Sequence, residues 1–479
     1  MLAADPALTI YNQDFAVIRE IIPLDLQQGP TSVRFTGTTA HLEPESVILR
    51  DPTGQRQLQI LEQSYRADPV SAELLLSLNE GKTINFLVQN RDQVEVVAGK
   101  IIRSGYHPGN PAYQGYQAYR PPGAVEQPII EVDGKRRFQL PGAPLFQTLA
   151  DDTILKPSIE WTIQSDRPGK LDAELAYVSG GMNWAADYNI VSQGSGDTLD
   201  VIGWGTMVNQ SGRMFENAHI KLMAGDVNKI RPREYAMNGA VAGLGGAQFS
   251  VAPPPVAEKT FDEYHLYTLQ RPATLHDRET KQVEFVRAAG VRSKIIYVYD
   301  GAKIDQNRFR GWQSEQIRND SGYGTQSNPK VWVMREFVNS DANHLGMPLP
   351  RGRVRFYRRD MDGRLEFTGE DSIDHTPRDE SIRTFTGAAF DLVGERRRTT
   401  FRIDHQRSML DESFEIKVRN HKKEPAEVRV VEHLYRGTTW EIPISSSPFK
   451  KTDSQTAEFQ IQLAPGEEKI VSYSAHYTW

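Results

Sequence analysis

The densest group of side chains that could do chemistry lies at residues 369–380. Its acidic and imidazole side chains belong to Glu370, Asp371, Asp374, His375, Asp379 and Glu380. Carboxylate oxygens beside an imidazole can hold a divalent cation or act as general acid and base. The spacing fits neither an EF-hand loop nor a His-Glu-x-x-His helix, and Asp and His in turns commonly satisfy backbone groups. Two hypotheses stay open: a metal or acid–base site at Glu370, Asp371, Asp374 and His375, or a turn.

The other histidines and the serines show no catalytic pattern along the chain. His344, His405, His421 and His433 are scattered, without a paired ligand spacing. No Gly-x-Ser-x-Gly elbow occurs, although a Ser-His-Asp triad built from distant positions stays open. The glycine-rich stretch 239–246 lacks the Gly-Lys-Ser/Thr ending of a phosphate-binding loop. The sequence therefore indicates no cofactor.

Aromatic residues in loop-like sequence form a second group of candidates. Trp312 follows Arg310-Gly311, and the segment 104–128 is punctuated by Gly and Pro. The main apolar residues of that segment are Tyr106, Tyr113, Tyr116 and Tyr119. Exposed aromatic side chains on loops are enriched at binding sites. These five residues are predicted to contact a peptide or a glycan, whereas the tryptophans in strand-like segments are expected in the core.

A basic run forms a third candidate. Its arginines are Arg351, Arg353, Arg355, Arg358 and Arg359. The first three alternate with small or apolar residues, which predicts the solvated face of a strand. Anion binding is the alternative, and the lack of interleaved aromatic residues argues against a nucleic-acid platform.

The composition narrows the class of protein. The chain has 479 residues, 38% hydrophobic and 25% charged, which is typical of about two to four globular domains. Its 56 basic and 62 acidic residues leave a net charge of −6, which argues against nucleic acid as a partner. The absence of cysteine excludes disulfides and thiolate metal sites. No apolar run reaches the roughly 18 residues that a membrane-spanning helix needs.

The first residues bear on the compartment. Met1-Leu-Ala-Ala-Asp-Pro6 is typical of an initiator methionine placed before the small-residue tail of a removed export signal. This interpretation predicts a periplasmic or extracellular protein. An ordinary cytosolic N-terminus is the alternative.

Short runs of alternating apolar and polar residues, separated by Gly, Pro, Asn and Asp, predict β-strands along most of the chain. One short helix is expected at residues 71–78. Strand pairing is predicted between 171–177 and 184–190, and hairpins are predicted over 353–367, 414–430 and 459–477.

The predicted fold class is all-β, with several antiparallel β-sandwich domains and one or two short helices. The expected domains are an N-terminal β domain with one helix at 5–103, a Tyr/Gly/Pro-rich loop at 104–128, a central β region at 129–375 with a flexible loop at 238–256, and a C-terminal immunoglobulin-like sandwich at 376–479.

Several segments carry the motifs of a bacterial family, in the same order. They include Leu8-Thr-Ile-Tyr-Asn-Gln-Asp-Phe15, Tyr177-Val-Ser-Gly-Gly-Met-Asn-Trp184, Leu222-Met-Ala-Gly-Asp-Val-Asn228, Glu263-Tyr-His-Leu-Tyr267, Gly387-Ala-Ala-Phe-Asp-Leu392, Val431-Glu-His-Leu-Tyr435 and Tyr473-Ser-Ala-His-Tyr-Thr-Trp479. On these motifs the chain resembles the domain-of-unknown-function family 4139, which includes the mucoidy-inhibitor-A-like proteins. The resemblance implies a β-rich, usually exported protein and supplies no catalytic residues. The chain departs from long family members because it lacks a heptad pattern for a coiled coil.

Two functions from different classes follow from the sequence. The favoured one is a non-catalytic structural, assembly or binding module of the cell envelope or the extracellular space, with a protein or a glycan as partner. The alternative is a secreted hydrolase that acts on envelope peptides or glycans through the acidic and histidine side chains of 370–380.

Overall fold

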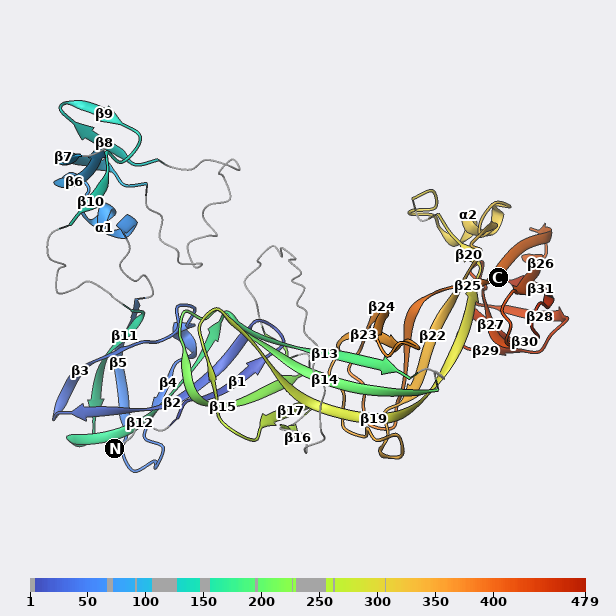
Figure 1. Cartoon of the computed structure of the whole chain (residues 1–479), viewed down its shortest axis with the longest axis horizontal. Helices are drawn as coiled ribbons and strands as arrows, with labels where there is room; N and C mark the ends of the chain where they lie inside the picture. Colours follow the sequence, from blue (N-terminus) through green and yellow to red (C-terminus); the bar gives the residue numbers. More distant parts are fainter. Residues whose placement is uncertain are drawn as a thin grey trace. The chain divides into compact units, whose positions relative to one another are not determined.

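The structure is a computed structural model, and its strands form several mostly antiparallel sheets (Figure 1). It describes residues 5–66, 72–90, 93–105, 127–146, 156–193, 197–225, 227–229, 256–261, 263–305 and 307–479. Strands make up 64% of the structure and helices 5%, with two short α-helices in the described residues. The predicted all-β class is confirmed. Neither of these helices has the length or the apolar character to cross a lipid bilayer.

One sheet has the strand order β16-β17-β15-β1-β2-β12-β4, and β18 pairs with β15. The strands are β1 (Ala7–Tyr11), β2 (Phe15–Leu26), β4 (Ile48–Arg50), β12 (Gly169–Gly180), β15 (Phe215–Ala224), β16 (Val256–Phe261), β17 (Tyr264–Leu269) and β18 (Ala273–Leu275). Every second residue of β12 is buried from Ala173 to Tyr177, which is the period of a strand with one face in the core.

Two smaller sheets belong to the N-terminal part of the chain. The first has the order β3-β11-β5, with β3 (Gly29–Thr36), β5 (Leu58–Arg66) and β11 (Ser158–Ser165). The second has the order β10-β6-β7-β8-β9, with β6 (Thr83–Asn90), β7 (Gln93–Arg103), β8 (Ile129–Val132), β9 (Lys135–Arg137) and β10 (Ala143–Leu145). Helix α1 (Ala72–Leu78) supplies Leu76 to the core of this second sheet, against Phe86 and Ile101. The described part of the predicted helix is confirmed.

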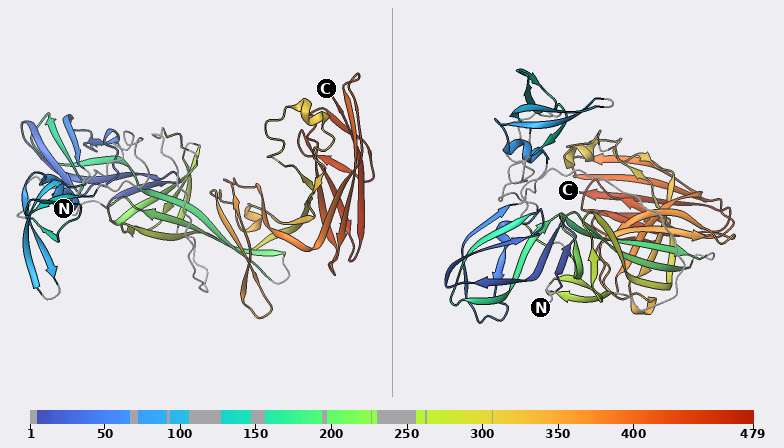
Figure 2. Two further views of the ribbon diagram at one scale, coloured as in Figure 1. Left: turned by 90° about the horizontal axis from the view of Figure 1, so that it is seen from above. Right: turned by 60° about the vertical axis from the view of Figure 1, so that its left-hand side comes forward.

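The largest sheet has the order β24-β23-β13-β14-β19-β22-β25-β26-β31-β28, and β27, β29 and β30 pair off this path. The strands are β13 (Met182–Ser192), β14 (Thr198–Asn209), β19 (Glu279–Asp300), β22 (Lys330–Val338), β23 (Gly352–Arg359), β24 (Leu365–Ile373), β25 (Ser381–Asp404), β26 (Met409–Asn420), β27 (Ala426–His433), β28 (Trp440–Ser445), β29 (Phe449–Lys451), β30 (Thr456–Leu463) and β31 (Glu468–Thr478). Figure 2 shows the C-terminal strands, in orange to red, running side by side, and β26 pairs with both β25 and β31.

The C-terminal strands pack in two layers around one core. One layer contains β25, β26 and β31, and the other contains β27 and β30. The ring of Phe459 in β30 lies 5.5 Å from the ring of Tyr473 in β31, although these strands share no hydrogen-bonded pairing. Alternate residues of both layers fill the core between them, as expected for packed sheets.

This layering corrects the two hairpins predicted at 414–430 and 459–477. Both edges of β26 are occupied, by β25 and β31, so β27 pairs with β30 and β19 instead. The connections therefore cross between the layers. Buried Asn420 fixes the first crossing, because its side-chain amide donates to the carbonyls of Glu424 and Ala464, each at 3.0 Å.

The predicted pairing of 171–177 with 184–190 is also wrong. Strand β12 is flanked by β2 and β4, whereas β13 lies between β14 and β23 in another sheet. Gly181, at a φ of 75°, turns the chain between them, and a Cβ there would lie 2.8 Å from the carbonyl oxygen of Gln210. The hairpin over 353–367 is confirmed, since β23 and β24 pair around the turn that ends at Gly363.

The described chain divides into two compact units, each discontinuous in sequence. Unit 1 combines Met1–Trp184, Met207–Met223 and Leu266–Lys281, and unit 2 combines Ala185–Thr206, Ala224–His265 and Gln282–Trp479. Strands β13, β14 and β19 each contribute residues to both units. No change of composition marks these divisions, and the contiguous boundaries drawn from the sequence stay a prediction.

Candidate binding site

Residues 301–329, named the α2 loop here, leave the sandwich at the end of β19 and return to it at β22. The loop contains α2 (Ser314–Asn319) and a short pairing of β20 (Ala302–Lys303) with β21 (Gln326–Ser327). Two carboxylates order its turns by accepting backbone N–H groups. Asp305 accepts from Asn307 at 3.0 Å, and Asp320 accepts from Gly322 at 2.6 Å. The loop therefore has its own hydrogen-bonded structure, as short Asx turns provide.

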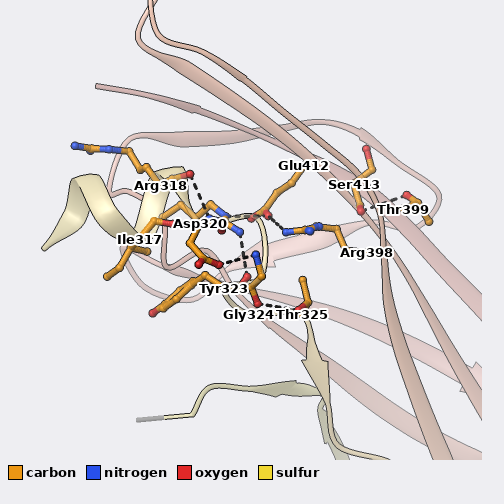
Figure 3. A network of polar contacts seen from close by, with 12 residues as sticks. Ile317, Arg318, Asp320, Tyr323, Gly324, Thr325, Arg398, Thr399, Glu412 and Ser413 are labelled. Atoms are coloured by element: carbon orange, nitrogen blue, oxygen red, sulfur yellow. Dashed lines mark hydrogen bonds and ion pairs between the residues drawn. The ribbon is translucent and has the colours of Figure 1, made fainter. Parts of the chain in front are cut away.

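The buried side chain of Arg436 joins this loop to the sandwich, and Figure 3 shows its partners Ile317, Asp320, Tyr323 and Glu412 close together. Its Nε donates to Oε2 of Glu412 at 2.9 Å. Its Nη1 donates to the carbonyls of Ile317 and Asp320 at 2.6 and 3.1 Å, and its Nη2 donates to that of Tyr323 at 3.0 Å. The carbonyl groups at the end of a helix lack partners within it. Arg436 thus satisfies the C-terminal end of α2 and the turn that follows.

A second buried arginine repeats the arrangement. Arg396 donates from Nε to both carboxylate oxygens of Glu432 at 2.9 Å, and from Nη1 to the carbonyl of Gly324 at 2.6 Å. The hydroxyl of Tyr473 donates to the same carboxylate at 2.5 Å. The guanidinium lies 3.9 Å from the ring centroid of Phe414, within the range of a cation–π contact. Each charge in this group has a hydrogen-bonded partner, which a buried ion requires.

The two groups are alike in their third member, a tyrosine. The hydroxyl of Tyr477 donates to Glu412 at 3.1 Å, as that of Tyr473 does to Glu432. Burial, and then the neighbouring carboxylate, raise the pKa of both tyrosines well above the ordinary value. Both phenols therefore stay protonated and act as donors. We call the two groups together the Arg–Glu–Tyr network.

Arg398 adds a further cation at the edge of this network. Its Nη1 lies 3.9 Å from Oε2 of Glu412, and the guanidinium lies 4.8 Å from the ring of Phe401. Figure 3 shows it aimed at the Glu412 carboxylate. Within the described residues, this buried Nη1 has no hydrogen-bond partner. Burial, as the largest cause, lowers the pKa of Arg398.

Trp312 lies on the α2 loop, half-buried. Its ring packs edge-on against Phe309 at 4.9 Å, and Phe309 packs against Tyr323 at 4.9 Å. Tyr323 in turn lies under the guanidinium of Arg436, at 5.7 Å. A continuous series of ring contacts therefore runs from the sequence-predicted tryptophan to the buried network.

The outer surface of the loop is basic as well as aromatic. Arg308 lies over Phe309 at 5.0 Å, and Arg318 lies over Trp479 at 4.6 Å. In the part of the chain that the structure describes, no carboxylate lies within 4.0 Å of Arg308, Arg310 or Arg318. Arg308 and Arg310 are exposed and keep their charge available at the surface, whereas Arg318 is partly buried.

A histidine and an aspartate meet where the α2 loop begins. Nε2 of His433 lies 3.0 Å from Oδ2 of Asp300, the last residue of β19. The imidazole stacks on the ring of Tyr435 at 4.9 Å, with 6° between the planes. The hydrogen bond to Asp300 is the main cause that raises the pKa of His433. The pair therefore favours the imidazolium form.

The predicted acidic cluster does not converge on one site. Glu370 faces Arg355 at 3.7 Å, and Asp371 accepts the backbone N–H of Phe385 at 2.6 Å. Nδ1 of His375 accepts the backbone N–H of Arg351 at 3.2 Å. Among the described residues no three His, Asp or Glu side chains are placed to hold a metal ion.

The remaining predicted residues differ in outcome. The carbonyl oxygen of Asp374 accepts the hydroxyl of Thr376 at 2.8 Å, within the turn that the sequence allowed. The alternation of the basic run is confirmed, because Val354 and Phe356 are buried while Arg353 is exposed. The predicted tyrosines Tyr106, Tyr113, Tyr116 and Tyr119 lie outside the described residues, as does nearly all of the predicted 238–256 loop.

With the geometry in place, the chain can be compared with known proteins. No family model matches it, and no curated protein matches it. The resemblance to family 4139 therefore stays a prediction that rests on its motifs.

Sequence reasoning missed the Arg–Glu–Tyr network, although a signal for it exists. Glu412 is in phase with buried Leu410 and Phe414 along β26. Glu432 ends the buried alternation of β27, and Arg396 continues that of β25. A charged residue at a core position of a strand needs a buried partner. A search for such positions would have found all three.

Proposed function

We propose that the chain is a non-catalytic binding or assembly module of the cell envelope or the extracellular space, and that it contacts its partner through the α2 loop. The observation that carries this proposal is the use of two buried arginines to hold loop carbonyls. Buried ion pairs contribute little net stability compared with apolar side chains of similar volume. Their use here therefore points to a requirement for one loop geometry.

The surface chemistry of the loop supports the same function. Trp and Arg are enriched among the residues that dominate protein interfaces, and Trp312 and Arg310 lie in one short turn beside Phe309. A loop that is ordered before binding loses less conformational entropy when the partner arrives. Compartment and exported character are proposed from the family resemblance alone.

The hydrolase alternative finds less support. Glu370, Asp371 and His375 each contact a different group, as described above. A general acid and base have to face a common substrate position. The separate contacts of these residues favour a structural role in β24 and in the turn that follows it.

A photo-crosslinking amino acid at position 312 tests the proposal in the producing cell. Position 361 is the matched control, because Met361 is fully exposed in the turn between β23 and β24. A discrete adduct at 312 that is absent at 361 is expected. The absence of any adduct at 312, or the same adducts at both positions, would contradict the proposal.

The partner found in this way gives a quantitative second test. Trp312→Ala and Arg310→Ala are each expected to weaken its binding by about tenfold or more, the usual effect of losing an interface anchor. Arg364→Ala, at an exposed arginine of the β23–β24 turn, is expected to leave binding unchanged. Equal affinities for all of these variants would exclude the α2 loop as the contact surface.

A further inference from the structure

A hollow of about 390 Å³ lies on the sheet of unit 2, away from the α2 loop in sequence. Its floor consists of small residues, Ala185 and Ala186 of β13 with Gly352 of β23. These strands run parallel, with Ala186 opposite Gly352. A Cβ on Gly352 would lie 2.2 Å from the carbonyl oxygen of Ala186. Glycine is therefore required for the close contact between these two strands.

The wall of the hollow carries two arginines and one carboxylate, that of Asp187. Arg351 and Arg353 line it, and Ser372 of β24, opposite Arg353 in the sheet, adds a hydroxyl. Nε of Arg353 lies 3.8 Å from Asp187, too far for a hydrogen bond. Within the described residues no carboxylate lies within 4.0 Å of Arg351. Two guanidinium groups thus keep donors for an incoming acceptor.

The carboxylate that lines the hollow, Asp187, and the neighbouring Glu370 are already engaged. Asp187 accepts the hydroxyl of Thr206 at 2.8 Å and lies 3.7 Å from Arg355, which also faces Glu370 at 3.7 Å. The arginines of this face, Arg351, Arg353 and Arg355, outnumber these two carboxylates. The backbone N–H of Arg351 donates to Nδ1 of His375 at 3.2 Å, and this bond fixes the backbone at the rim of the hollow. The backbone at the rim is therefore fixed, and its arginines exceed these carboxylates by one.

We propose that this hollow binds a small organic oxyanion, with Arg351, Arg353 and the Ser372 hydroxyl on its phosphate or carboxylate. Guanidinium groups hold such groups through paired, charge-assisted hydrogen bonds. The volume lies near the lower end of ligand sites, roughly 300 to 1,000 Å³, so it suits a small molecule. The low alanine floor receives the uncharged body of the ligand.

Calorimetric titration at low ionic strength tests this site, with glycerol 3-phosphate and inorganic phosphate as probes. Saturable binding is expected, and R351Q/R353Q is expected to weaken it by about tenfold or more, because paired charge-assisted bonds are lost. The control R364Q/R407Q removes the same charge at two strongly exposed arginines elsewhere. It is expected to leave the affinity within about twofold, since surface charges act weakly at a distance.

A third variant separates shape from charge. Ala185 is exposed on the floor, so Ala185→Leu fills the hollow without changing its charge. This variant is expected to weaken the binding of glycerol 3-phosphate more than the binding of inorganic phosphate. The proposal is overturned if the wild type shows no saturable binding. It is also overturned if R351Q/R353Q and R364Q/R407Q reduce the affinity for both probes to the same extent. Circular dichroism of each variant confirms that it is folded.

Discussion

An Arg–Glu–Tyr group occurs in both compact units, with different outcomes. In unit 1, Arg213 donates to both carboxylate oxygens of Glu20 at 2.8 and 2.7 Å and to the hydroxyl of Tyr177 at 3.2 Å. In unit 2, Arg396 donates to Glu432 through Nε alone and sends Nη1 to a loop carbonyl. The difference lies in where the remaining donors of the guanidinium point.

That difference decides what the charge contributes. The bidentate pair of unit 1 closes on itself between β2, which carries Glu20, and the segment before β15, which carries Arg213. In unit 2 the two arginines hold the α2 loop, which is distant from them in sequence, against the sandwich. A planar guanidinium can do either because it has five donors in a fixed geometry. Buried charge joins two segments of one sheet in unit 1 and holds a loop against the sandwich in unit 2.

The largest expected effect comes from Arg436→Met. The change leaves Glu412 buried without its main partner, and it leaves the carbonyls of Ile317 and Tyr323 without the donor that Arg436 supplies. Loss of one member of a buried pair costs about 3–5 kcal/mol. Arg213→Met is expected to cost a similar amount in unit 1. Denaturant unfolding of both variants measures these losses.

Hydrogen exchange then distinguishes the two variants. Amides of the α2 loop are expected to lose protection in Arg436→Met and to keep it in Arg213→Met, because only Arg436 of these two arginines contacts the loop carbonyls. If both variants expose the loop equally, the distinction between closure and docking is wrong.

A smaller effect is expected from removing the tyrosine hydroxyls. Tyr473→Phe removes a 2.5 Å bond to buried Glu432 and is expected to cost about 1.5–3 kcal/mol, the range for bonds to charged groups. Tyr177→Phe removes an acceptor 3.2 Å from Arg213, which keeps two bonds to Glu20. Its cost is expected to be about 1 kcal/mol. Equal losses of unfolding free energy for the two variants, measured in urea, would show that the two tyrosine hydroxyls contribute equally and would contradict the comparison.

The pH dependence of stability provides a third test, specific to unit 2. The pKa of His433 is raised in the fold, chiefly by its bond to Asp300. Its stabilisation is therefore full below the ordinary histidine pKa, about 6.5, and is lost as the pH rises through the folded value. His433→Gln is expected to remove that dependence, measured as the difference in unfolding free energy from wild type between about pH 5 and 9. An unchanged profile in the variant would contradict the assignment.

The smallest effect is expected at Arg397, the neighbour of Arg396 on the opposite face of β25. Its contact with Glu415 is 3.4 Å long and exposed. Surface ion pairs contribute about 0–1 kcal/mol, so Arg397→Met is expected to cost no more than that. The matched change Arg396→Met should cost several times as much, because it leaves Glu432 uncompensated. Similar costs at the two positions would argue against a buried network.

Local sequence accounts for much of the fold and for part of the site. The alternation of Val354 and Phe356 with arginines predicted β23, and the glycine at 363 marked its turn. The structure places Trp312 in a turn of the α2 loop, half-buried, and its role as a binding residue stays a prediction. The Arg–Glu–Tyr network was beyond prediction as a set, because Arg396, Glu412 and Glu432 lie on three different strands. Their pairing depends on how these strands pack, and no local sequence motif specifies it.

What the sequence determined by itself was the face of each strand. In β26, Leu410, Glu412 and Phe414 occupy the core face because side chains alternate with period 2. The tertiary structure alone decided which strand lies beside which. The pattern of β26 suits β27 as well as β31 as a neighbour, and only closure of two layers around a common core selects β31. The same closure brings the three strands of the network together and gives the α2 loop its place.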